Sequence, residues 1–261
     1  MKTKKIALSF DFEECDLPRE SAVEFPLEKG MRVSIPGANA VLDILERQGI
    51  KATFFCTANF AENAPGVMKR LIAGGHEIGS HGVDHWQQDE TDPKRSKEAI
   101  EKRYGVTVYG YRQPRMFPVD DASLKAEGFL YNSSINPAFI PGRYCHFDVP
   151  RRPFMKAGLL QLPASVVPVI RFPLFWLALH LLPEFAYRWL VKFTLAVDGC
   201  FITYFHPWEF FQLGDHPEWK IPWMIRYHAG QDMSERLERF IVAMKKAGSH
   251  FVTLREVALD K

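Results

Sequence analysis

Large apolar residues alternate with small or polar residues from position 6 to position 13. This period of two predicts a β-strand whose two faces meet different surroundings. The alternation puts Asp11 and Glu13 on one face, near the carboxyl end of the strand, and sends Glu14 to the other face. Two carboxylates are therefore expected side by side where the first strand ends.

Further apolar patterns predict strands and helices in alternation. Helices are expected where apolar residues recur at intervals of three and four and a glycine follows. The predicted strands are 6–13, 51–57, 76–80, 108–112, 201–205 and 250–253. The predicted helices are 38–48, 66–73, 94–104, 122–127 and 234–247.

Alternating strands and helices are typical of an α/β fold with a largely parallel sheet. The chain has 261 residues, of which 47% are hydrophobic, and no repeat or linker-like segment, so residues 1–261 are expected to form a single domain. Asp11, His81, Arg112 and His206 all fall at the carboxyl ends of predicted strands. In (β/α) barrels the active site lies at that end.

The motif from His81 to His85 (HGVDH) supplies two imidazoles for a cation beside the acidic pair. Like carboxylates repel each other unless a cation or a shared proton relieves them. Two imidazoles and one carboxylate leave coordination positions open for water, which is typical of a catalytic metal site. We predict Glu13, His81 and His85 as the ligands, because Glu14 lies on the wrong face of the strand.

Four segments, in this order, resemble the NodB-type polysaccharide deacetylase family. They are SFDFE (9–13), SHGVDH (80–85), RQP (112–114) and YFHPWE (204–209). Segments 128–135, 162–165 and 205–210 look like the branch associated with exopolysaccharide and capsule biosynthesis. The resemblance implies a distorted (β/α) barrel that hydrolyses N-acetyl groups on sugars.

The resemblance also implies roles for three further residues. Asp11 is expected to act as the general base that takes a proton from metal-activated water, and Arg112 is expected to orient Asp11 and keep it ionised. His206 is expected to be the general acid to the leaving amine. The ion is expected to be Zn²⁺, and Co²⁺, Ni²⁺ or Fe²⁺ would suit the same ligands.

Two positions depart from the family pattern. Glu13 stands where the family usually has aspartate. Its extra methylene displaces the carboxylate oxygen, which is expected to affect which metal ion binds and how tightly. Asn132 stands where the branch commonly has aspartate, which removes a charge.

The expected activity is metal-dependent N-deacetylation of an acetamido sugar within a polysaccharide or its precursor. One alternative is a hydrolase of small cyclic amides or ureides with the same fold. The other is a catalytically inactive sugar-binding or assembly protein, which the two departures would suit. The candidates for stacking on a sugar ring are Trp86, Tyr204, Trp208 and Phe210.

The charge, the cysteine spacing and the N-terminal residues indicate which binding partners and which cellular compartment to expect. A formal net charge of +2 with interspersed signs gives no strong field for nucleic acid, and none is expected as a partner. The four cysteines are far apart and form no Cys-x-x-Cys motif, which fits a reducing compartment. The N-terminal apolar run is short and is interrupted by Asp11, unlike a signal sequence. We therefore expect a cytoplasmic protein.

Residues 159–191 concentrate large apolar side chains. Prolines at 163, 168, 173 and 183 interrupt the segment, so no transmembrane helix is expected. Core filling explains part of this density, and a subunit interface or a shallow membrane contact would explain the rest. We predict a homo-oligomer that buries part of this segment between subunits.

Overall fold

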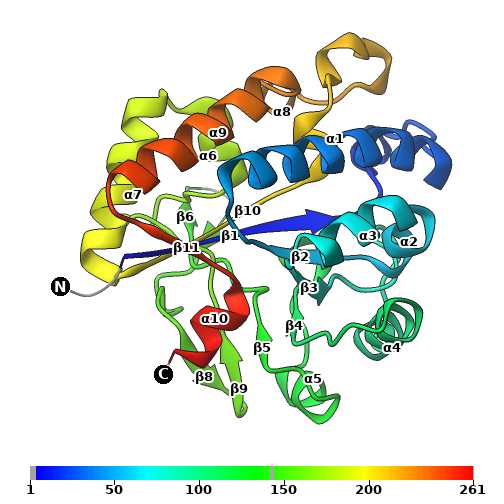
Figure 1. Ribbon diagram of the computed structural model, residues 1–261, viewed down its shortest axis with the longest axis horizontal. Helices are drawn as coiled ribbons and strands as arrows, with labels where there is room; N and C mark the ends of the chain where they lie inside the picture. The colour runs from blue at the N-terminus through cyan, green and yellow to red at the C-terminus, as the bar shows by residue number, and fades with distance from the viewer. Residues whose placement is uncertain (1–3, 142–143, 261) are drawn as a thin grey trace.

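The computed structural model describes residues 4–141 and 144–260, and a curved sheet with helices packed against it runs through the molecule (Figure 1). The strands are β1 (Lys5–Phe12), β2 (Thr53–Cys56), β3 (Glu77–Ser80), β4 (Gly110–Tyr111), β5 (Tyr131–Asn132), β6 (Phe139–Ile140), β7 (Tyr144–Cys145), β8 (Phe154–Lys156), β9 (Leu159–Gln161), β10 (Cys200–Phe205) and β11 (His250–Val252). The α-helices are α1 (Leu27–Gln48), α2 (Ala58–Asn63), α3 (Pro65–Ala73), α4 (Asp92–Tyr104), α5 (Asp121–Ala126), α6 (Trp176–Leu181), α7 (Glu184–Asp198), α8 (Trp223–Arg226), α9 (Gln231–Lys246) and α10 (Leu254–Leu259). The 3₁₀ helices are η1 (Leu17–Ser21), η2 (Pro114–Met116), η3 (Pro207–Phe210), η4 (Leu213–Asp215) and η5 (Pro217–Trp219).

The main sheet runs in the order β10, β1, β2, β3, β4, β5, β9 and β8, and β11 also pairs with β1. All these pairings are parallel except that between β8 and β9. Ser165, which follows β9, reaches across to β10: its N–H donates to the Ile202 carbonyl at 2.8 Å, and its Oγ accepts from the Ile202 N–H at 2.9 Å. A loop therefore joins the two sides of the curled sheet, which makes the barrel distorted.

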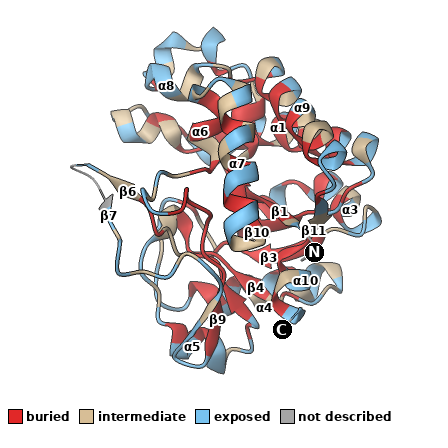
Figure 2. Cartoon of the chain, turned by 90° about the vertical axis from the view of Figure 1, so that its left-hand side faces the viewer, coloured by how far each residue is buried: buried red, intermediate tan, exposed pale blue. Residues whose placement is uncertain are grey.

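The two faces of β1 meet two different hydrophobic clusters. Ile6, Leu8, Phe10 and Phe12 belong to the large cluster between sheet and helices, whereas Ala7 belongs to a smaller cluster on the inner side of the sheet. The distribution of β1 residues between the two clusters confirms the alternation predicted from the sequence. The central strands are buried and the outward surfaces of the helices are exposed (Figure 2), whereas β8 is largely exposed.

The register of the parallel strands brings their carboxyl ends into one line. Phe12 is level with Cys56, Cys56 with Ser80, and Ser80 with Tyr111. On the other side of β1, Phe10 is level with Phe205. The residues that follow these strand ends, among them Glu13, His81, Arg112 and His206, therefore gather at one edge of the sheet.

Each predicted strand and helix is present, and most boundaries differ by at most three residues. The exception is α1, which was expected to start at residue 38 and begins at Leu27. Pro36 lies inside this helix, and Gly37 follows it. The strands β5 to β9 were not predicted, because strands of two or three residues carry too little alternation to be recognised. The helices of residues 176–198 were not predicted either.

Residues 159–191 form β9, α6 and the first half of α7, with buried and exposed parts. The exposed apolar residues of α7 are Phe185, Trp189, Phe193 and Val197, with exposed fractions of 73%, 65%, 40% and 40%. Because they recur every four residues, they lie along one side of the helix. Within the described ranges, no helix combines the length and the apolar character needed to cross a bilayer.

We predict that Gly37→Ala destabilises the fold. A Cβ at this position would lie 1.8 Å from the backbone oxygen of Pro207, so α1 and η3 would have to move apart. Overpacking of this kind costs about 1–3 kcal/mol. Thermal unfolding measures the loss. Gly66→Ala in α3 is the matched control, because its Cβ would meet no atom within 4 Å, and a melting temperature lowered equally in both variants would contradict the packing argument.

Candidate metal centre and active site

Three predicted ligands meet at the carboxyl edge of the sheet. Glu13 Oε2 lies 3.3 Å from His81 Nε2 and 3.1 Å from His85 Nε2. The ligand atoms of the three residues all lie within 4.8 Å of one another, and the three residues are buried. The structure therefore brings together the group that the sequence predicted.

The second nitrogen of each imidazole fixes its tautomer. His81 Nδ1 lies 2.8 Å from the carbonyl oxygen of Arg112, and His85 Nδ1 lies 2.7 Å from Asp16 Oδ2. Both oxygens accept hydrogen bonds, so each Nδ1 carries a proton, and in the neutral ring the lone pair is on Nε2. Outer partners of this type orient metal-binding histidines.

Three electron-pair donors consequently face one another. Glu13 Oε2 is buried and receives no hydrogen bond from any described residue, although both Nε2 atoms are close to it. A buried carboxylate oxygen without a proton donor is costly, and a cation removes that cost. Two imidazole nitrogens and one carboxylate fit a divalent transition metal ion such as zinc.

Charge at the site favours a cation as well. Burial raises the pKa of Glu13, but the neighbouring imidazoles of His85 and His81 outweigh it and lower that pKa to about 2, so Glu13 is ionised at neutral pH. Burial lowers the pKa of His85, whereas the carboxylates of Glu13 and Asp16 raise it to about 9. The negative potential at His85 Nε2 attracts a divalent ion for the same reason.

Asp11 is held beside this group by a buried ion pair. Arg112 Nη1 donates to Asp11 Oδ1 at 2.6 Å, and its other nitrogens donate to the carbonyl and the hydroxyl oxygen of Ser133 at 3.1 and 2.9 Å. The guanidinium also lies over the ring of Phe55, 4.3 Å from its centre. Arg112 thus has a fixed position, and Asp11 keeps its second oxygen for other partners.

His206 lies on the other side of Asp11. Its Nε2 is 4.0 Å from Asp11 Oδ2, and its Nδ1 is 3.0 Å from Glu209 Oε1. Burial lowers the pKa of His206, but its hydrogen bond with Glu209 and the negative charge of Glu13 outweigh burial and raise it. The structure therefore brings all six predicted site residues together.

Several supporting residues were not recognised in the sequence. Glu14 accepts hydrogen bonds from Thr57 Oγ1 at 2.7 Å and from the His85 N–H at 3.0 Å, so it anchors the His85 loop and is not a ligand. Asp16 and Glu209 orient His85 and His206. The HPWE segment was one available signal, because a carboxylate three residues after a histidine can reach back to it.

Asn132 supports Arg112 indirectly. Its side-chain oxygen accepts from the Ser134 N–H at 2.9 Å, its amide donates to Asp121 Oδ1 at 2.8 Å, and Ser134 Oγ accepts from the Gln113 N–H at 2.8 Å. The amide N–H that meets Asp121 is one that a carboxylate lacks. Asparagine therefore suits this position, where two carboxylates would repel.

The aromatic residues suggested for sugar stacking have other contacts. Trp208 is buried, stacks on His206 with ring centres 4.5 Å apart, and donates to Glu13 Oε1 at 3.0 Å. Tyr204 and Phe210 are also buried. The suggestion is therefore wrong for these three residues, whose rings are packed in the interior. Trp86 is 39% exposed and remains a candidate.

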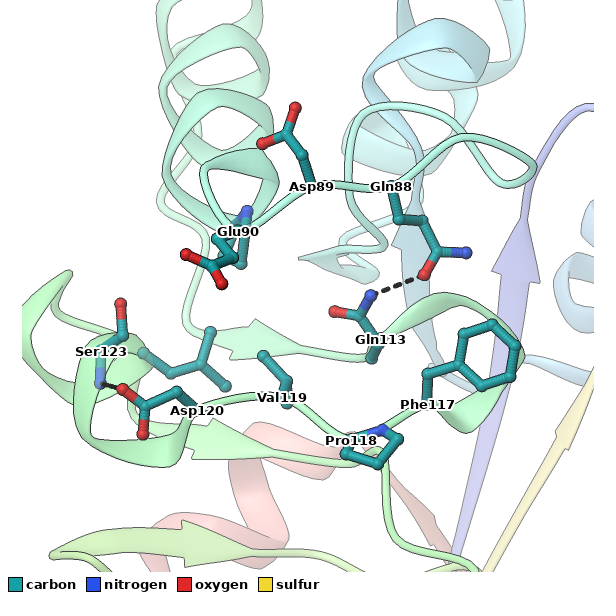
Figure 3. A pocket seen from close by; sticks show the side chains of 11 residues that line it. Gln88, Asp89, Glu90, Gln113, Phe117, Pro118, Val119, Asp120 and Ser123 are labelled. Atoms are coloured by element: carbon teal, nitrogen blue, oxygen red, sulfur yellow. Dashed lines mark hydrogen bonds between the residues drawn. The ribbon is translucent and has the colours of Figure 1, made fainter.

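A cavity of about 610 Å³ opens next to the site, between the loop after His85 and the segment after Arg112 (Figure 3). Gln113 Nε2 donates to Gln88 Oε1 at 2.7 Å at its inner end, and Gln88 Nε2 donates to the His85 carbonyl at 3.0 Å. Phe117, which is 52% exposed, also lines the cavity (Figure 3). The cavity combines an apolar face with amide and carboxylate groups.

Together, the fold and the site define a distorted (β/α) barrel in which two histidines and one carboxylate could hold a metal ion. Residues 2–127 match the family described as "Polysaccharide deacetylase". The matched residues include three of the four motifs, those at 9–13, 80–85 and 112–114.

Named relatives match parts of the chain. A peptidoglycan-N-acetylglucosamine deacetylase of Listeria monocytogenes is 35% identical over 101 residues, which are 39% of this chain and 16% of that protein. A chitooligosaccharide deacetylase of a Bradyrhizobium strain is 34% identical over 60 residues, 23% of this chain and 27% of that protein. The chain thus matches less than a third of the length of these two relatives.

Solved structures are similar over nearly the whole chain. A Mycobacterium smegmatis protein assigned to the polysaccharide deacetylases has a TM-score of 0.68 and 19% identity, with 99% of this chain and 90% of that chain covered. An allantoinase has a TM-score of 0.65 and 15% identity, with coverage of 98% and 90%. At these identities the likeness concerns the fold alone, and it confirms the predicted distorted barrel.

We predict that His81→Ala and His85→Ala abolish binding of a divalent ion, because each removes one of only three ligands. After incubation with zinc and dialysis, elemental analysis should find about one ion per chain in the unmodified protein and little in either variant. His216→Ala is the control, since His216 pairs with Glu218 outside the site. Full occupancy in either ligand variant would show that the ligand assignment is wrong.

Proposed function

We propose that this protein is a metal-dependent hydrolase that removes N-acetyl groups from acetamido sugars of a polysaccharide or its precursor. The observation that carries the proposal is the arrangement of a base and an acid beside the ligand group. Asp11 Oδ2 and His206 Nε2 are 4.0 Å apart, and Asp11 lies two residues before Glu13, at the end of β1. The family match over residues 2–127 and the relatives named for peptidoglycan and chitooligosaccharide deacetylation support the choice of substrate.

Amide hydrolysis needs an activated water, a stabilised oxyanion and a proton for the leaving nitrogen. A divalent ion held by Glu13, His81 and His85 would polarise the acetyl carbonyl and lower the pKa of water. Asp11, oriented by Arg112, accepts the proton of that water. His206 donates a proton from Nε2 to the amine as the C–N bond breaks, and the products are acetate and the free amino sugar.

The cavity beside Gln113 offers space for the sugar next to the reacting one. Phe117 presents an apolar ring face and the two glutamines present polar atoms, a combination suited to a sugar ring. An oligosaccharide is therefore the proposed substrate rather than a free monosaccharide.

No observation favours the two alternatives. The allantoinase likeness, at 15% identity, concerns the fold alone and gives no reason to prefer a ureide. The fold also occurs in a pseudoenzyme from Bacillus anthracis, with a TM-score of 0.55, so the fold does not distinguish active from inactive members. The site residues support an active enzyme, because the Glu13 carboxylate lies next to both histidines despite its additional methylene.

We predict different losses for the two acidic residues. Asp11→Asn should retain the ion and lose roughly 10²- to 10⁴-fold in rate, because an amide preserves shape but cannot accept the proton. Glu13→Gln should weaken metal binding first and activity as a consequence, and added zinc should restore part of the activity only in this variant. Acetate release from N-acetylglucosamine oligomers, read beside metal content, measures both.

The opposite pattern, in which Asp11→Asn loses the ion and Glu13→Gln keeps it, would exchange the two roles. Absence of acetate release from N-acetylglucosamine oligomers and from other N-acetylated glycans by the fully metal-loaded protein would contradict the proposed function. Small cyclic amides and ureides serve as comparison substrates, and turnover of these alone would favour the first alternative.

We further propose that two copies of the chain pair through the exposed apolar side of α7. Light scattering at micromolar concentration and physiological salt should give a mass above that of one chain, and Phe185→Glu combined with Trp189→Glu should give a monomer. Trp223→Glu is the matched control, because Trp223 is 63% exposed on α8. A monomeric unmodified protein would contradict this proposal.

A further inference from the structure

A second buried histidine lies behind the proposed general acid. His180 on α6 has no exposed surface, and its Nε2 is 2.9 Å from Glu209 Oε2. The other oxygen of Glu209 accepts from the His206 N–H at 2.6 Å and contacts His206 Nδ1 at 3.0 Å. Glu209, which is also fully buried, therefore joins the two imidazoles in one line.

The partners of His180 fix where its protons lie. Its Nδ1 is 2.6 Å from the backbone oxygen of Tyr227, which can only accept, so Nδ1 carries a proton. The 2.9 Å contact between Nε2 and Glu209 Oε2 would otherwise set two lone pairs against each other inside the protein. A second proton must lie in that contact, whether it is bonded to the nitrogen or to the oxygen.

The same reasoning gives the tautomer of His206. Its Nδ1 faces Glu209 and donates to it, so its Nε2 is the nitrogen directed toward Asp11 and the reacting groups. With a bare carboxylate behind it, an imidazole holds its proton tightly and becomes a poorer acid. A proton shared between Glu209 and His180 cancels that negative charge.

We propose that His180 is a positioning residue of the active site, which holds one proton against Glu209 so that the pair is neutral and His206 can give its own proton to the leaving amine. The role of His206 as general acid rests on the proposed function. The proton count at His180 and Glu209 rests on the hydrogen-bond geometry alone.

Other charged and titratable groups surround the hydrogen-bonded chain of His180, Glu209 and His206. Asp11 and Glu13 face His206 from β1 and the residue after it, and both are negative. Arg236 of α9 donates to the carbonyls of Leu179 and Leu182, on either side of His180 in the chain, and lies 3.9 Å from Glu184. The Tyr187 hydroxyl of α7 donates to the Leu174 carbonyl. The described contacts place none of these groups on Glu209, so His180 is the partner that balances its charge.

The test is a pH titration of the His206 ring by nitrogen-15 NMR in metal-loaded protein. His180→Gln can donate a hydrogen bond to Glu209 but cannot supply a proton, so His206 should keep its proton to higher pH, by on the order of one unit. Glu209→Gln also leaves a neutral group behind His206, so the titration should stay close to that of the unmodified protein. The double variant should behave as Glu209→Gln alone, because His180 acts through Glu209.

The control is His216→Gln, which removes a histidine from a surface pair with Glu218 and should leave the titration unchanged. The high-pH limb of the kcat/KM profile should move in the same direction as each titration. A purely structural role for His180 would lower the rate equally at all pH values and leave the His206 titration in place, which would overturn the proposal.

A further measurement and a comparison of outcomes separate the test of this inference from the test of the proposed function. In the unmodified protein, NMR should detect a slowly exchanging proton between His180 Nε2 and Glu209, and a contact without a proton would overturn the proposal even if His180→Gln fails to fold. Titration shifts in a protein that deacetylates no glycan would support the inference while the proposed function failed.

Discussion

The site is organised by three buried groups that face one another, the Glu13 carboxylate and the Nε2 atoms of His81 and His85, and all three are electron-pair donors when the imidazoles are neutral. Asp16 and the Arg112 carbonyl hold the Nδ1 protons of His85 and His81, so both Nε2 lone pairs point at the Glu13 carboxylate. Such an arrangement is unfavourable in a protein interior unless a cation occupies it. The surrounding hydrogen bonds engage Nδ1 of each imidazole and leave both Nε2 atoms available to a metal ion.

The barrel delivers these groups through strand register rather than through long loops. Because neighbouring parallel strands end level with one another, a residue that follows each strand reaches the same edge, and the supporting residues lie within a few positions of the same strand ends. Helix α1 passes so close to η3 that only glycine fits at position 37. Packing in the helical layer therefore bears on the segment that carries His206 and Glu209.

Alternation along the first strand allowed Asp11 and Glu13 to be placed on one face, and the family motifs suggested the distorted barrel and the roles of Arg112 and His206. The structure brings the six proposed site residues together. The sequence did not predict Asp16, His180 or Glu209 as partners, since these contacts join segments whose distance apart depends on the tertiary fold. Trp208 was wrongly suggested to stack on a sugar, because the sequence does not show whether an aromatic residue beside a catalytic motif is buried. The start of α1 was predicted eleven residues too late, since helical spacing was recognised only from residue 38.

The most direct test of the metal centre is X-ray absorption spectroscopy of the zinc-loaded protein, supported by the anomalous signal in a crystal. The account predicts a single ion bound by two imidazole Nε2 atoms at roughly 2.0–2.1 Å and one Glu13 oxygen at roughly 2.0–2.2 Å, with the remaining positions open to water. An ion bound by Asp11 in place of Glu13, or one that lacks either imidazole, would contradict it.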